Sequence, residues 1–161
     1  GPLARKDLLD TVHHQVTTTV NRGAQLITGG HPLAQTGFYF PITILKDIPH
    51  NTPAYRDEIF GPVVCLMSAK NEKDAIRQAN DSRFGLGAGI FSRDLRKANR
   101  IAQHQLEAGA CAINHCLSSD PALPFGGIKD SGLGRELGEA GIKAFTNTKT
   151  LTQRPQKKIK Y

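Results

Sequence analysis

Residues 124–136 read PFGGIKDSGLGRE, and the preceding chain is best understood as a scaffold that delivers this segment. It contains four glycines, one phenylalanine and an Arg–Glu pair that predicts the start of a helix. A paired glycine after an aromatic residue is typical of a backbone that turns tightly against something bulky, because glycine reaches positive φ without steric cost. By itself, a long turn before the last helix would be the simpler explanation. A second unusual segment, DEIFGPV at residues 57–63, favours a ligand site.

Strands and helices alternate between these two segments. Apolar strand patterns are separated by helical patterns that begin at good N-cap residues, Asn71 for one helix and Ser92 or Asp94 for the other. This order predicts parallel strands joined by right-handed crossovers. Ligands bind outside the carboxyl ends of such strands, where residues 115–125 lead into the glycine-rich segment. The predicted elements are strands at 63–69, 88–92 and 110–114, a turn at 84–87, and helices at 71–82 and from 94 to about 109.

The remaining elements complete the prediction of an α/β fold, with a parallel-rich sheet and helices on both faces. Apolar residues recur every fourth position from Leu8 to Val20, so residues 5–22 predict an amphipathic helix that ends at Gly23. The other expected elements are a strand at 24–28, an extended segment at 37–48, a proline-rich loop at 49–62, a last helix at 136–145 and an exposed strand at 147–153.

Size and composition indicate one soluble globular domain. A chain of 161 residues with 39% hydrophobic and 22% charged residues has enough apolar side chains for a core of its own. No apolar run reaches the length of a membrane span and the first residues lack a secretory signal, so no membrane partner is expected. The odd number of cysteines, Cys65, Cys111 and Cys116, argues against a disulfide framework and favours a reducing cytoplasm.

The net charge of +7 is concentrated at the C-terminus. The last eight residues contain no acid and four basic residues, which are Arg154, Lys157, Lys158 and Lys160. A solvated basic tail without interleaved aromatic residues does not form a nucleic-acid platform. We therefore expect no nucleic-acid partner.

Two other candidate sites are rejected on spacing. Residues 132–134 (GLG) begin like a dinucleotide fingerprint, but Leu137 occupies the third glycine position and no strand precedes it. Cys111, His115 and Cys116 are close in sequence, but no second Cys/His pair completes a tetrahedral metal site. We expect no bound metal.

Taken together, the segments resemble the C-terminal part of the NAD(P)-dependent aldehyde dehydrogenase family, from Gly1 to about Thr152. The collinear segments are GPLAR, GFYFPITIL, DEIFGPVV, AND-S-FGLGAGIFSRDL, PFGG-K-SG-GRE and the NTKT strand. GPLARKDL, DIPHNTPAYRDE and SSDPALPFGG make the bacterial succinate semialdehyde dehydrogenases the most similar subgroup. The resemblance implies oxidation of an aldehyde, succinate semialdehyde in that subgroup, to its acid with NAD or NADP.

The resemblance also implies roles for individual residues. Glu58 would bond the nicotinamide ribose and Phe60 would pack against the nicotinamide, which suits a carboxylate acceptor and a flat apolar ring. Phe125 would line the aldehyde pocket, and Ser119 would contact the distal carboxylate of succinate semialdehyde. Without the resemblance, Glu58 would be interpreted as an exposed loop acid. The loop that selects the substrate also carries Asn114, His115 and Ser118.

No catalytic residue is expected in this chain. The family mechanism needs a cysteine thiolate to attack the aldehyde and a glutamate to activate water, and in the family both lie upstream of GPLAR with the cofactor-binding domain. Cys65 falls in a strand predicted to be buried, where its pKa would be raised, and Cys111 and Cys116 match non-catalytic family positions. We therefore expect a truncated chain that is inactive alone and binds no cofactor by itself.

Domains and partners follow from the same resemblance. Residues 1–146 would be part of an aldehyde dehydrogenase catalytic domain, and residues 147–161 an oligomerisation strand with a basic tail. The strand Asn147 to Gln153 offers an unpaired edge, and this region joins subunits in the family, so a homo-oligomer is expected. A separate N-terminal fragment is a second candidate partner. The alternative to part of an enzyme is a non-catalytic remnant that acts as a self-associating module.

Overall fold

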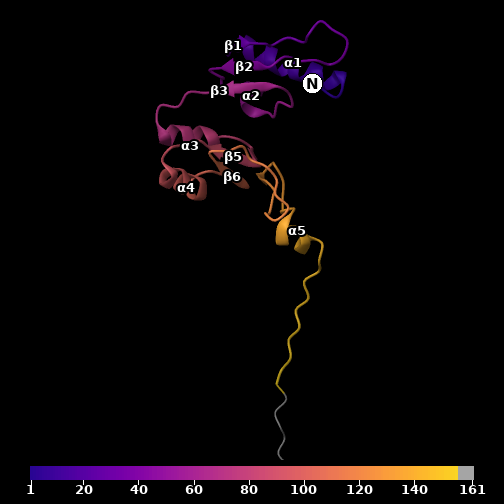
Figure 1. Cartoon of the computed structure of the whole chain (residues 1–161), viewed down its shortest axis with the longest axis vertical. Coiled ribbons are helices and arrows are strands. Elements are labelled where there is room, and N and C mark those ends of the chain that lie inside the picture. Colours follow the sequence, from indigo (N-terminus) through magenta and orange to yellow (C-terminus); the bar gives the residue numbers. More distant parts are fainter. Residues whose placement is uncertain (156–161) are drawn as a thin grey trace, which may run out of the picture. The chain divides into compact units, whose positions relative to one another are not determined.

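The computed structural model describes residues 1–155, which divide into two compact units, Gly1–Arg83 and a second unit that begins at Phe84 (Figure 1). Each unit carries strands and helices of its own, as the predicted α/β class requires. The predicted boundary between a catalytic-domain part and a C-terminal strand at residue 146 stays a prediction. Within residues 1–155, no helix is both long enough and apolar enough to cross a membrane.

The first unit is built on a three-stranded sheet in the order β1-β2-β3. Its strands are β1 (Gln25–Thr28), β2 (Thr43–Lys46) and β3 (Val63–Leu66). β1 and β2 pair antiparallel, whereas β2 and β3 pair parallel with Leu45 opposite Cys65. All three strands lie inside the segments predicted from the sequence.

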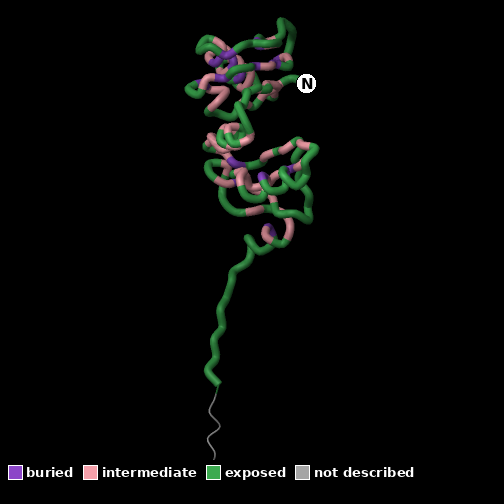
Figure 2. The backbone as a smooth tube through the Cα atoms, turned by 90° about the vertical axis from the view of Figure 1, so that its left-hand side faces the viewer, coloured by how far each residue is buried: buried purple, intermediate pink, exposed green. Residues whose placement is uncertain are grey.

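Helix α1 (Lys6–Asn21) supplies the centre of the core of this unit. Val12 and Val16 lie four residues apart on one helical face and are each 1% exposed. They pack in one cluster with Ala24, Phe40, Leu45 and Ile48. Figure 2 shows most of the buried residues in the unit that contains the N-terminus. The helix ends as predicted, because Gly23 has φ +111 and its N–H bonds the Val20 carbonyl at 2.9 Å.

Two shorter helices complete the first unit. Helix α2 (Pro53–Arg56) is a single turn in the segment predicted to be a loop. That prediction is wrong, because proline at the first helical position has a preset φ and lacks an N–H that the helix would leave unpaired. Helix α3 (Glu72–Asn80) is capped as predicted, with Asn71 Oδ1 accepting the N–H of Asp74 at 3.0 Å.

The second unit contains two strand pairs. β5 (Gly87–Ile90) and β6 (Ala110–Ile113) pair parallel, with α4 (Leu95–His104) between them in the sequence. The predicted parallel pairing is confirmed for these two strands, while β3 takes β2 as its parallel partner. Asp94 caps α4 by accepting the N–H of Lys97 at 2.9 Å. The buried apolar residues described in this unit are Ala98, Ile101 and Ala112.

Two predictions around the glycine-rich segment are wrong. The predicted turn at 84–87 contains β4 (Phe84–Gly85), which pairs antiparallel with β7 (Ile128–Lys129). The last helix, α5 (Gly138–Ala144), begins two residues later than predicted, because Glu136 is bridged to Phe125. Pairing across the glycine-rich segment therefore overrides the helical pattern of the sequence.

Residues 147–155 form neither a helix nor a strand and are exposed. The strand predicted at 147–153 has no strand partner within the described part of the chain, so its pairing with a second chain stays a prediction. Three of the four basic tail residues, Lys157, Lys158 and Lys160, lie outside the described residues.

Candidate functional site

The EIFGPV loop projects two side chains and packs the residue between them. It runs from Asp57, after α2, to Val63 at the start of β3. Ile59 packs against the core cluster, whereas Glu58 is exposed and the Phe60 side chain is 71% exposed. The loop therefore presents a carboxylate and an aromatic ring to solvent from an anchored backbone.

Three contacts hold this loop against helix α1 and strand β2 of the first unit. The Gln15 side-chain amide donates to the carbonyl of Glu58 at 3.3 Å, and the carbonyl of Pro62 accepts an N–H from β2 at 2.9 Å. Gly61 lies so close to Val12 that an added Cβ would stand 2.9 Å from a valine methyl group. Close packing on α1 thus gives a physical reason for the glycine in this segment.

A polar cluster fixes the chain just before the loop. Tyr55 Oη donates to Asp81 Oδ2 at 2.8 Å, while Arg56 Nη1 lies 3.4 Å from Asp81 Oδ1 and His50 Nδ1 lies 3.5 Å from Asp81 Oδ2. The hydrogen bond from Tyr55 and the charge of Arg56 lower the pKa of Asp81. Sequence reasoning missed this cluster, because Asp81 is 26 residues from Tyr55 and 25 from Arg56.

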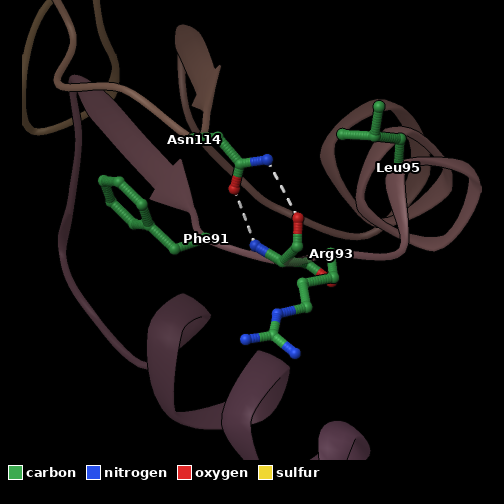
Figure 3. A pocket seen from close by; sticks show the side chains of 5 residues that line it. Phe91, Arg93, Leu95 and Asn114 are labelled. Atoms are coloured by element: carbon green, nitrogen blue, oxygen red, sulfur yellow. Dashed lines mark hydrogen bonds between the residues drawn. The ribbon is translucent and has the colours of Figure 1, made fainter.

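The second unit has a hollow at the carboxyl ends of β5 and β6, the position predicted for a ligand from the strand order. Its volume is about 610 Å³. Figure 3 shows the Asn114 amide facing the backbone that follows β5 and joined to it by two hydrogen bonds. The residues that line the hollow are Phe91, Ser92, Arg93, Leu95 and Asn114.

The segment 115–124, which leaves β6 beside this hollow, is exposed throughout and carries Ser119. Before Ser119, the Leu117 side chain lies so close to Gly87 that a Cβ added there would overlap it. After Ser119, Asp120 Oδ1 accepts the N–H of Ala122 at 2.8 Å. Ser119 therefore lies between a side chain that contacts Gly87 and a local turn of the exposed segment.

The glycine-rich segment is closed at its two ends. Phe125, which is half-buried, and Glu136 exchange two backbone hydrogen bonds at 2.8 Å. The Arg135 guanidinium donates to two carbonyls inside the loop, at 2.8 and 2.6 Å. A Cβ added at Gly109 would overlap the carbonyl of Gly126, so the chain packs tightly against its own backbone here. The paired glycine predicts a close neighbour for this backbone, and that neighbour includes Gly109, directly before β6.

The cysteines of the strands lack the features of an activated nucleophile. Burial raises the pKa of the Cys65 thiol and of the Cys111 thiol, so little thiolate forms on either at neutral pH. Cys65 is half-buried in β3, rather than fully buried as predicted. Among the described residues, no group of three His, Cys, Asp or Glu side chains could hold a metal ion.

The predicted site residues fall in two places. Glu58 and Phe60 share the EIFGPV loop of the first unit, whereas Ser119 and Phe125 lie in the second unit, on the exposed segment and at the entrance of the glycine-rich loop. The structure describes each pair within its own unit. The roles of these four residues in cofactor and substrate binding stay predictions.

Comparison with known proteins gives one consistent result. The sequence profile described as "Aldehyde dehydrogenase family" matches residues 1–151. The chain is 44% identical to a succinate semialdehyde dehydrogenase of Escherichia coli (strain K12) and 46% identical to a probable succinate-semialdehyde dehydrogenase of Synechocystis, each over 151 residues. These alignments cover 94% of this chain but 32% and 33% of the two relatives. The chain therefore spans about a third of the length of the curated relatives it matches.

Solved structures agree with the sequence comparison. The crystal structure of succinic semialdehyde dehydrogenase from Streptococcus pyogenes in complex with NADP+ matches with a TM-score of 0.87 at 40% identity, over 91% of this chain and 32% of that one. A Mycobacterium tuberculosis aldehyde dehydrogenase complexed with NAD+ matches with a TM-score of 0.86 at 36% identity, over 91% of this chain and 30% of that one. By sequence and by structure, this chain belongs to the aldehyde dehydrogenase family.

Proposed function

We propose that this chain supplies part of the cofactor and substrate sites of an aldehyde dehydrogenase that oxidises succinate semialdehyde to its acid with NAD or NADP. The observation that carries the proposal is the projection of Glu58 and Phe60 into solvent from a loop whose intervening residue packs against the core cluster. The names of the two relatives at 44% and 46% identity support the choice of substrate.

On the cofactor side, the exposed groups fit a nicotinamide nucleoside. The Glu58 carboxylate is a strong acceptor that can bond two ribose hydroxyl groups. Phe60 presents a flat aromatic face on which the nicotinamide ring, positively charged in the oxidised cofactor, can stack. When bound, NAD or NADP accepts the hydride that leaves the aldehyde carbon.

On the substrate side, Ser119 and Phe125 divide the recognition of succinate semialdehyde. The Ser119 hydroxyl can donate to the distal carboxylate, and Phe125 can line the pocket beside the methylene groups. We assign neither the nucleophile nor the base that activates water to a residue of this chain. We therefore expect no turnover and no bound cofactor from the 161-residue chain alone.

The proposal can be tested in a hybrid enzyme, in which residues 1–151 replace the matching third of the Escherichia coli relative. We expect the hybrid to reduce NAD or NADP with succinate semialdehyde, and the isolated chain to give no reduced cofactor. Turnover by the isolated chain, abolished by a Cys→Ala change, would overturn the assignment of no catalytic residue.

Two variants of the hybrid examine the individual roles. Ser119→Ala should raise KM for succinate semialdehyde about tenfold, the effect of one lost hydrogen bond to a charged group. The KM for butanal, which has the same chain length but no distal carboxylate, should not change. Glu58→Gln should raise KM for the cofactor and leave KM for both aldehydes unchanged. Equal effects of Ser119→Ala on the two aldehydes would contradict the proposed substrate.

A second candidate function is a self-associating module, and one observation favours it. Residues 147–155 are exposed, and Leu151 within them is 87% exposed, without a strand partner among the described residues. Such a segment can add to a sheet edge of a second copy of the chain. Light scattering should then show an oligomer that is lost when residues 147–161 are deleted. A monomer at high concentration, unchanged by the deletion, would exclude this function.

A further inference from the structure

Asn114 is the residue at which the chain turns away from the parallel pair β5 and β6. Its own N–H still bonds the carbonyl of Ile90 at 2.8 Å, which is the last backbone bond of the pair. Ile90 lies opposite Ile113, so in a regular parallel ladder the Asn114 carbonyl would next accept the N–H of Ser92. The structure replaces that bond.

The Asn114 side chain accepts the hydrogen bond that the Asn114 carbonyl would accept in a regular ladder. Its Oδ1 accepts the N–H of Ser92 at 2.7 Å, and its Nδ2 donates to the carbonyl of Ser92 at 2.9 Å (Figure 3). An amide carries both a donor and an acceptor, so one side chain satisfies both backbone groups. The partners also fix the orientation of the amide, because the reversed amide would set N–H against N–H.

This exchange frees the Asn114 backbone to leave the plane of the strands. Asn114 has φ +59, in the left-handed region that asparagine enters more readily than most residues. The backbone bends while the polar groups of Ser92 remain satisfied, which a purely apolar side chain at residue 114 could not achieve. The exposed segment 115–124 starts directly after this bend.

We propose that Asn114 is a positioning residue. Its side-chain amide fixes the direction in which the segment 115–124 leaves β6, and with it the place at which Ser119 is presented. The contact of Ser119 with substrate rests on the proposed function. The pair of hydrogen bonds between Asn114 and Ser92, called the clamp below, does not. The two parts can therefore fail separately.

The clamp is tested in the 161-residue chain by amide hydrogen exchange, followed residue by residue by NMR. Asn114→Gly retains access to positive φ but removes the amide. We expect the Ser92 amide to exchange about tenfold faster and the backbone chemical shifts of 115–119 to change, with no change in α1. Ser92→Ala is the matched control, because both clamp bonds use the Ser92 backbone, and its residue 92 amide should stay protected. Unchanged exchange in Asn114→Gly would overturn the proposal.

Asn114→Asp keeps the shape of the side chain but makes its hydrogen bonding depend on pH, so the pH dependence of amide exchange separates the two contributions. A carboxylate can accept the Ser92 N–H but repels the Ser92 carbonyl, whereas a protonated carboxyl both donates and accepts. After correction for the intrinsic pH dependence of exchange, the residue 92 amide should be more protected below about pH 4 than at pH 7. The same exchange measurement on the wild-type chain gives the contribution of the neighbouring charged or titratable residues, Arg93, Asp94 and His115, to any pH dependence. Equal protection of the variant at both pH values would indicate a steric role and overturn the proposal.

The link to substrate is tested in the hybrid enzyme. Asn114→Gly should raise KM for succinate semialdehyde about tenfold and change kcat less than about twofold, because a misplaced Ser119 weakens binding and not the chemical step. The KM for butanal should change little. Faster exchange at Ser92 with an unchanged KM would overturn the positioning of Ser119 by Asn114 if Ser119→Ala raises KM, and would contradict the substrate role of Ser119 if Ser119→Ala does not.

Discussion

The EIFGPV loop and the segment that leaves β6 differ in how much apolar packing holds them. The first combines two hydrogen bonds with apolar packing, with Ile59 against the core cluster and Gly61 against Val12. The second is anchored by the side-chain hydrogen bonds of Asn114 and by the Leu117 side chain against Gly87, and its own residues are exposed. Apolar packing spreads the stabilisation of a loop over many atoms, whereas the hydrogen-bonded segment depends on a few. We therefore expect single substitutions to affect the two regions through different mechanisms.

The same contrast holds for the two units. The core cluster of the first unit contains six buried hydrophobic residues, and the buried hydrophobic residues described in the second are Ala98, Ile101 and Ala112. The second unit also uses close contacts of glycines, such as Gly109 on Gly126. Core truncation should therefore be most costly in the first unit, and added volume at a glycine in the second.

The largest effect is expected for Leu45→Ala. The Leu45 side chain is 0% exposed at the centre of the core cluster, so its truncation leaves a cavity. We expect the free energy of unfolding of the first unit to fall by about 3 kcal/mol, measured by urea denaturation. Leu133→Ala, which truncates a fully exposed leucine, is the control and should change it by less than about 0.5 kcal/mol. Similar losses for both would contradict the assigned core.

Gly109→Ala should have the next largest effect, in the second unit. Its Cβ would overlap the carbonyl of Gly126, and backbone cannot move as freely as a side chain. We expect a loss of about 2 kcal/mol in unfolding free energy. Gly89→Ala is the matched control, since the nearest atom to its Cβ would be a Phe91 ring carbon at 3.9 Å. Equal tolerance of both alanines would show that glycine contacts do not hold this unit.

Local signals in the sequence predicted most elements. The fourfold spacing of apolar residues predicted α1, and the cap residues Asn71 and Asp94 located α3 and α4, because these signals act within a few residues. Glu136 was assigned to the last helix for the same reason. Its pairing with Phe125 depends on closure of the intervening loop, which no local pattern reports.

The candidate site residues can be predicted from the sequence only within the segments that stand in the same order as in the aldehyde dehydrogenase family. Only the family resemblance points to Glu58, Phe60, Ser119 and Phe125. The two hydrogen bonds between Asn114 and Ser92 join residues 22 positions apart, and neither the predicted strand at 110–114 nor the substrate loop gives a sign of them. Such contacts are decided by the register of β5 and β6, so they follow from the sheet and not from the sequence pattern.

An acid titration should reveal a hydrogen-bonded anchor in the first unit as well. The N–H of Lys70 and the Arg77 guanidinium lower the pKa of Asp74 to about 2. An unfolded aspartate has a pKa of about 3.9, so this stabilisation is present above about pH 4 and is lost as the pH falls towards 2. Asp74→Asn should flatten the dependence of the urea midpoint on pH in that window. The exposed Asp57→Asn serves as the control, and an identical change in both would contradict the assignment.

The smallest effect on stability is expected at the residue with the clearest proposed contact to cofactor. Phe60→Ala should lower the free energy of unfolding by less than about 0.5 kcal/mol, because 71% of its side chain is already in water. Ile59→Ala, one position earlier, should cost about 1 kcal/mol or more because the partly buried Ile59 packs against the core cluster. If Phe60→Ala proved as costly as Ile59→Ala, the ring would be a packing residue. A near-zero cost would show that the ring does not stabilise this unit, as the proposed contact with the cofactor requires.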